Sequence, residues 1–77
     1  MTRQPDEDHD VIVHQARLHF EGVSRNTWTV WLGDERQGEK DSLKAAAELA
    51  CHLAALHSRP AWLLDETGYP LKPIERR

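Results

Sequence analysis

The sequence has little of what would commit a short chain to a disulfide, a membrane or nucleic acid. Its single cysteine, Cys51, excludes an internal disulfide and favours a reducing compartment. No apolar run approaches the roughly 20 residues of a membrane-spanning helix, and residues 1–10 lack the apolar core of a secretion signal. Lys and Arg number 10 against 13 Asp and Glu, and the net charge of −3 argues against a strongly basic nucleic-acid-binding domain. We therefore expect a soluble, cytoplasmic protein with no membrane contact.

Motifs for catalysis and metal binding are missing as well. The four glycines are isolated from one another, so there is no glycine-rich phosphate loop. His52 and His57 are about 140° apart around a helix, and His14 and His19 lie on opposite faces of a strand. No pair of Cys or His residues has the spacing of a common zinc site. We expect no enzyme activity, no metal and no cofactor.

What the sequence does contain is a clear order of secondary-structure elements. Residues 1–10 carry four acidic side chains against one arginine and are predicted to be a disordered acidic tail. Residues 11–20 alternate between apolar and polar, which predicts a half-buried strand. Residues 21–26 supply Gly and Asn for a turn, and residues 27–32 have the β-branched and aromatic pattern of a second strand. Together these segments predict a hairpin with a longer loop.

The clearest pattern is an amphipathic helix that begins at Asp41 or Ser42 and ends near Ser58. Residues 33–41 are polar and are predicted to be a loop. Both Asp and Ser are good N-cap residues, and Pro60 cannot continue a helix. Between these ends, leucines and alanines fill an arc of about 180° around the helix axis, with charged residues opposite. Such a helix covers one face of a sheet.

The remaining residues predict one buried strand and a weak edge strand. Residues 61–64 form a short apolar run, and residues 65–68 have the composition of a turn. Within residues 69–74, Pro70 and Pro73 remove hydrogen-bond donors, which confines this segment to an edge.

The element order therefore predicts a small α+β domain. The expected order is β-β-α-β with a weak final β, and the sheet is small and antiparallel or mixed. One amphipathic helix packs on one of its faces. The disordered acidic tail is expected to cover residues 1–10, and the single α+β domain residues 11–77.

The second strand predicts an exposed sheet face. If Trp28, Val30 and Leu32 face the helix-covered core, the period of two directs Trp31 and its neighbouring threonines outward. An exposed tryptophan among cationic side chains can anchor a protein partner or stack on a base. The candidate binding residues on this face are Trp31, Arg17, His19, Arg25 and Thr29.

Trp31 and the nearby acidic residues each allow another interpretation. Trp31 can instead pack under the acidic tail, under residues 69–74, or in the interface of a homodimer. Two adjacent carboxylate pairs are expected to be solvated, and read functionally they are candidate contacts to a basic partner. One pair is Asp34 and Glu35, and the other is Asp65 and Glu66.

Residues 28–74 also resemble known small domains. They combine a Trp-x-Val strand, a polar loop, an alanine-rich helix that begins Ser-Leu-Lys-Ala-Ala-Ala, an apolar strand and an Asp-x-x-Gly turn. This order resembles a family of short bacterial and phage domains of unknown function. In size and layout the chain is also similar to small phage anti-CRISPR proteins.

The second resemblance implies a function. It implies a non-catalytic inhibitor in a bacterial or phage-infected cell, which binds a protein or nucleoprotein complex such as a CRISPR effector and occludes one of its surfaces. A nucleic-acid-binding domain that uses the same face, or an uncharacterised bacterial domain, is the alternative. A homodimer is a further possibility.

Overall fold

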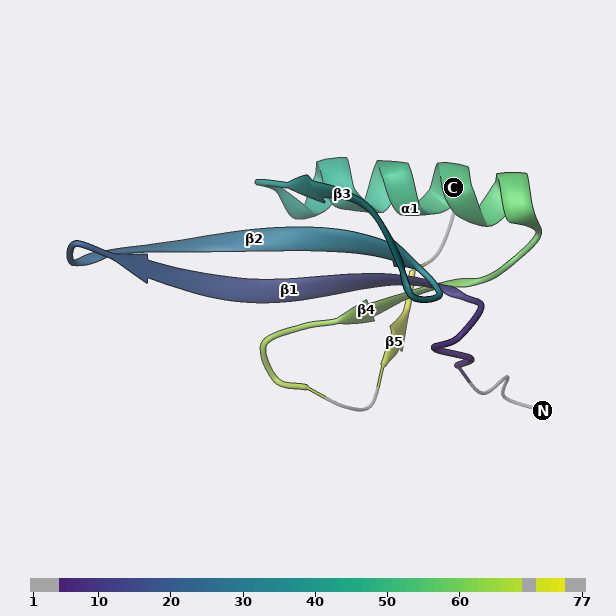
Figure 1. The fold of residues 1–77 in the computed structure, drawn as a ribbon, viewed down its shortest axis with the longest axis horizontal. Coiled ribbons are helices and arrows are strands. Elements are labelled where there is room, and N and C mark those ends of the chain that lie inside the picture. The colour runs from purple at the N-terminus through teal and green to yellow at the C-terminus, as the bar shows by residue number, and fades with distance from the viewer. Residues whose placement is uncertain (1–4, 69–70, 75–77) are drawn as a thin grey trace.

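The structure is a computed structural model that describes residues 5–68 and 71–74. Its described part contains five strands and one helix in the order β-β-β-α-β-β (Figure 1). These elements are β1 (Val11–Phe20), β2 (Val23–Leu32), β3 (Glu35–Lys40), α1 (Leu43–His57), β4 (Ala61–Leu64) and β5 (Lys72–Pro73). All strands belong to one sheet of order β3-β2-β1-β4-β5. The α+β class, with one helix packed on a mixed sheet, is confirmed.

Strands β1 and β2 form a hairpin that is longer than the sequence predicted. They pair antiparallel without interruption from Val11 opposite Leu32 to Phe20 opposite Val23. The connection is only Glu21 and Gly22, and both have positive φ angles, 48° and 79°. A two-residue turn of this kind matches the natural twist of the strands. The predicted loop over residues 21–26 is therefore mostly strand.

Strand β3 was predicted to be a loop. Its sequence, Glu-Arg-Gln-Gly-Glu-Lys, contains no large apolar residue, because it is the edge strand of the sheet and most of its side chains are exposed. Gly38 is its point of contact with the helix, since a Cβ atom there would lie 3.3 Å from Cδ2 of Leu49. Periodicity cannot reveal a strand that buries so little.

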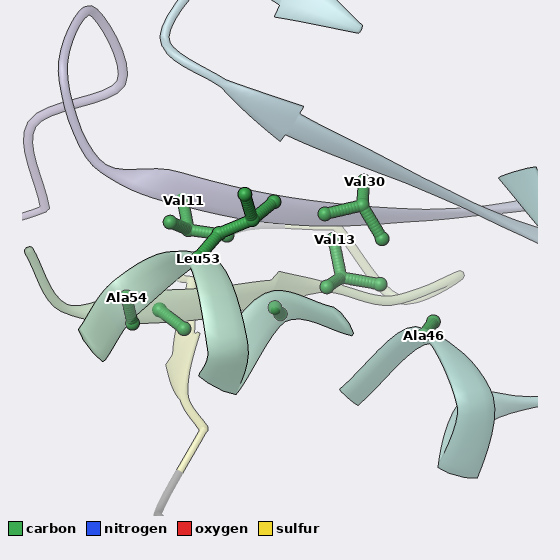
Figure 2. Close-up of a cluster of buried hydrophobic side chains, with 8 residues drawn as sticks. Val11, Val13, Val30, Ala46, Leu53 and Ala54 are labelled. Atoms are coloured by element: carbon green, nitrogen blue, oxygen red, sulfur yellow. The ribbon is translucent and has the colours of Figure 1, made fainter. Parts of the chain in front are cut away.

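The helix and its capping are as predicted. The Ser42 hydroxyl oxygen accepts a hydrogen bond from the Ala45 amide at 3.2 Å, and the helix ends at Ser58, whose φ angle is 54°. Helix α1 lies over one face of the sheet, which we call the helix-covered face. The core on this face consists of Val11, Val13, Val30, Ala46, Ala50, Leu53, Ala54 and Ala61 (Figure 2). Its many alanines keep the core thin and bring the helix close to the sheet.

Residues 5–10 were predicted to belong to the disordered tail, but they form a turn attached to the core. Asp10 is 0% exposed and accepts hydrogen bonds from Trp62 Nε1 at 2.9 Å and from the Asp6 amide at 3.0 Å. Its second carboxylate oxygen lies 3.1 Å from Nη2 of Arg59. Acidic composition suggested disorder, whereas a partnered carboxylate can be buried. Residues 1–4 of the predicted tail lie outside the described residues.

The C-terminal strands agree with the prediction in outline. Strand β4 pairs parallel to β1, and the two-residue β5 pairs antiparallel to β4 at the sheet edge. Residues 69–70, which include Pro70, lie outside the described residues. Across the described ranges, α1 is too short and too polar to cross a bilayer.

Candidate protein-binding surface

The face of the sheet opposite α1 is the candidate surface, and we call it the helix-free face. The uninterrupted register of the hairpin fixes which side chains it carries, because side chains alternate along a strand. The hairpin contributes Ile12, His14, Ala16, Leu18, Phe20, Val23, Arg25, Thr27, Thr29 and Trp31. Trp28, Val30 and Leu32 contact the helix-covered core, as expected from their spacing.

One end of the helix-free face carries a second apolar cluster. Ile12, Trp62 and Leu71 are buried there, and Trp31 and Leu64 pack against them. Beside this cluster is a shallow hollow of about 190 Å³, which we call the hollow. It is lined by Glu7, Ile12, His14, Trp31, Gly33 and Leu64.

Trp31 is on the expected face, but it is not in the open. Its side chain is partly buried and packs against the second apolar cluster, to which Leu71 contributes from the C-terminal segment. Glu7 of the N-terminal turn lines the same hollow. The alternative in which Trp31 packs beside these two segments therefore describes the fold better than the exposed tryptophan.

Arg17 and His19 do not join Trp31. The two-residue turn pairs odd-numbered residues of β1 with even-numbered residues of β2, so Arg17 lies opposite Asn26 and His19 opposite Ser24. This register places both side chains on the helix-covered side of the sheet. Arg17 donates to Oε2 of Glu66 at 2.8 Å, and Nδ1 of His19 lies 2.7 Å from the Ser24 hydroxyl oxygen.

Arg25 and Thr29 are on the helix-free face with Trp31. Thr29 is partly buried opposite His14, two residues from Trp31. Arg25 is exposed, but it lies six positions from Trp31, which corresponds to about 20 Å of strand. The cluster of one tryptophan and three cations is therefore not assembled.

The acidic candidates divide into two groups. Asp34 and Glu35 are exposed where β2 leads into β3. Glu66 forms the ion pair with Arg17, whereas hydrogen bonds from Lys72 and then from Thr67 lower the pKa of Asp65 from 3.8 to about 2. Asp65 and Glu66 thus stabilise the chain itself, and only the first pair is free of such contacts among the described residues.

The sequence pattern did not predict the outer half of the hairpin. Strand β4 pairs with β1 only over residues 11–14, and β3 pairs with β2 only over residues 28–32. Residues 15–27 therefore have no described strand neighbour outside the hairpin, and we call them the hairpin arm. In Figure 1 the arm extends at the left beyond α1 and the other strands.

The arm ends in large exposed apolar side chains. Leu18, Phe20 and Val23 are 50%, 76% and 65% exposed, and all three lie on the helix-free face. Phe20 and Val23 are direct neighbours across the turn. The sequence does contain a signal for this patch, because Gly22 follows Glu21 between two apolar residues, as in a tight hairpin turn.

Other parts of the described structure offer weaker candidates for a metal or ligand site. No three His, Cys, Asp or Glu side chains in residues 5–68 and 71–74 lie together as metal ligands. A larger hollow of about 480 Å³ lies where α1 leads into β4, and Arg59 is the charged residue that lines it. That guanidinium already pairs with Asp6 and Asp10, so it contributes to the fold.

The described residues form a small α+β domain with one helix, and large apolar side chains are exposed on its helix-free face. No protein-family model, no curated protein and no solved structure matches the chain. The resemblances to bacterial and phage domains therefore stay predictions.

Proposed function

We propose that the protein is a non-catalytic protein-binding module that occupies a surface of its partner. The proposal depends on one observation, the three large apolar side chains that are exposed together at the end of the hairpin arm. A contiguous exposed apolar patch on a small domain is typical of an interaction site. Leu18, Phe20 and Val23 have no role in either core cluster, so their exposure requires another explanation.

The surroundings of the patch suggest the chemistry of the partner surface. Arg25 is exposed on the same face, next to Leu18 across the hairpin. A surface with an apolar pocket and an acidic rim would complement this arrangement. A projecting arm can block such a surface without any reaction. A surface on a bacterial CRISPR effector complex, suggested by the resemblance to anti-CRISPR proteins, is one partner of this kind.

Nucleic-acid binding is the second candidate. The observation in its favour is the two-stranded arm with Arg17 and Arg25, because the major groove of DNA admits a β-ribbon of this width. The net charge of −3 and the ion pair of Arg17 with Glu66 oppose it. Binding to duplex or single-stranded DNA that falls steeply with added salt would favour this candidate.

Capture from a nuclease-treated bacterial lysate tests the proposal. We expect the unmodified protein to retain a partner that the Phe20→Ser variant loses, because removal of an anchor residue costs about 2 kcal/mol or more, roughly a 30-fold weaker affinity. Leu56→Ser is the matched control, since Leu56 is 67% exposed but lies on α1. A partner that both variants retain equally would show that the arm is not the binding element.

A further inference from the structure

We infer that the helix-free face of the free protein is covered by the same face of a second copy, in a two-fold symmetric dimer. The inference shares this face with the proposed function, but it names a different first occupant. Another partner would then have to displace the second copy.

The hairpin arm lacks the support that a pair of strands normally needs. Within the described residues, each strand of the arm has one hydrogen-bonded neighbour over residues 15–27, and no described helix or strand packs on the helix-free side of the arm. A two-stranded hairpin alone is only marginally stable in water. Its apolar side chains at Leu18, Phe20 and Val23 are the largest exposed group on this face. A second layer would both support the arm and remove this surface from water.

The face is complementary to itself under a two-fold rotation. The arm end is marked by the pair Phe20 and Val23, and the hollow by the pair Ile12 and Trp31. Halfway between them lies the pair of Ala16 with its partner on β2, four residues or about 13 Å from each end. A two-fold axis through this midpoint lays the arm end of each copy over the hollow of the other. Both contacts then form at once.

The residues at the proposed axis are suited to close approach. Ala16 has the smallest side chain on the hairpin, and Thr27 opposite it is only 3% exposed. Both side chains are short. Packed sheets lie about 10 Å apart, so small residues at the centre let the larger residues at the two ends reach the facing sheet.

One charge on the helix-free face agrees with this antiparallel arrangement. Arg25 is the exposed cation of the arm on this face, because Arg17 lies on the helix-covered side and pairs with Glu66. The two-fold rotation about Ala16 brings Arg25 of each copy over Thr29 of the other, beside the exposed Glu39 of β3. The alternative, edge pairing of two β1 strands about Leu18, would place Arg17 opposite His19 of the other copy.

Sedimentation equilibrium between about 1 and 500 μM gives the first test. We expect a mass of twice 8.9 kDa at the upper end of this range. Phe20→Ser should raise the dissociation constant at least about 30-fold, whereas Leu56→Ser on α1 should not change it. A wild-type protein that stays monomeric throughout refutes the dimer, but it leaves the proposed function intact because a bare face can still bind another partner.

Charge exchange at the axis gives the sharper test. Ala16 would face its own copy, so Ala16→Arg and Ala16→Glu should each be monomeric, and a mixture of the two should form a heterodimer detectable by native mass spectrometry. Ala55→Arg on the exposed side of α1 is the control for an added charge. Circular dichroism shows whether each variant is folded. If the Ala16 variants do not fold, the Phe20→Ser result alone tests the geometry of the dimer. A wild-type dimer that Phe20→Ser leaves intact, or folded Ala16 variants without heterodimer formation, would refute this geometry.

Discussion

The attachment of the N-terminal turn through Asp10 makes a quantitative prediction. Asp10→Ala removes the hydrogen bonds from Trp62 Nε1 and the Asp6 amide, and it leaves Arg59 with Asp6 as its remaining carboxylate partner. Each hydrogen bond to a charged group contributes about 1.5 kcal/mol or more, and breaking a buried ion pair costs about 3 to 5 kcal/mol. Within the described residues, Asp10 Oδ1 makes no directed hydrogen bond despite its 3.1 Å approach to Arg59. We therefore expect the lower figure, about 3 kcal/mol.

This loss would be large for so small a domain, because a chain of this length has a total stability of roughly 4 to 12 kcal/mol. Urea denaturation followed by circular dichroism measures the free energy of unfolding, and the slope of the transition shows whether the native state stays compact. Asp8→Ala is the control, since Asp8 is exposed in the same turn. A loss below about 1 kcal/mol for Asp10→Ala would mean that the turn does not hold the core in solution.

Three further changes test other parts of the fold. Trp62→Phe should lower the free energy of unfolding by about 1 kcal/mol more than Trp28→Phe. Nε1 of Trp62 donates a hydrogen bond to Asp10, whereas Nε1 of Trp28 has no hydrogen-bond partner within the described residues. Equal losses in urea denaturation would contradict this prediction. Gly33→Ala should lower the melting temperature more than Gly22→Ala, since both have positive φ but only a Cβ at Gly33 would overlap a carbonyl oxygen of the N-terminal turn. The pKa of Asp65 is lowered from 3.8 to about 2, so its contribution to stability is present above pH 4 and is lost as the pH falls toward 2. Denaturation across that range should show a shallower pH dependence for Asp65→Asn, and an unchanged profile would contradict the assignment.

The parts of the fold that the sequence predicted are those that bury a regular pattern. Helix α1 was predicted because its apolar residues repeat with the helical period and Ser42 caps its first turn. Strand β1 was predicted because its residues alternate between apolar and polar, and β4 was predicted because it is a short apolar run. In each case the buried residues form a pattern within the element itself, so the sequence of that element predicts the structure.

The parts that the sequence did not predict depend on partners elsewhere in the chain. Strand β3 has an edge position and buries almost nothing, and Asp10 is stabilised by side chains more than 45 residues away. The predicted grouping of Arg17 and His19 with Trp31 was wrong for a related reason. Whether Arg17 and Trp31 share a face depends on the length of the turn between their strands, and the turn at Glu21 and Gly22 is shorter than the predicted loop.

The parallel pairing of β1 with β4 has a consequence for how the chain folds. The hairpin can form from near neighbours, because its turn has two residues. The β1 and β4 pairing instead joins Val11 to Ala61, fifty positions apart, and such distant contacts are slow to form. We expect the hairpin to form first and the far side of the sheet to be completed only after α1 has covered the core. A nascent chain would therefore expose its hairpin arm before its core is closed, which makes the arm the segment most open to early encounters with other chains.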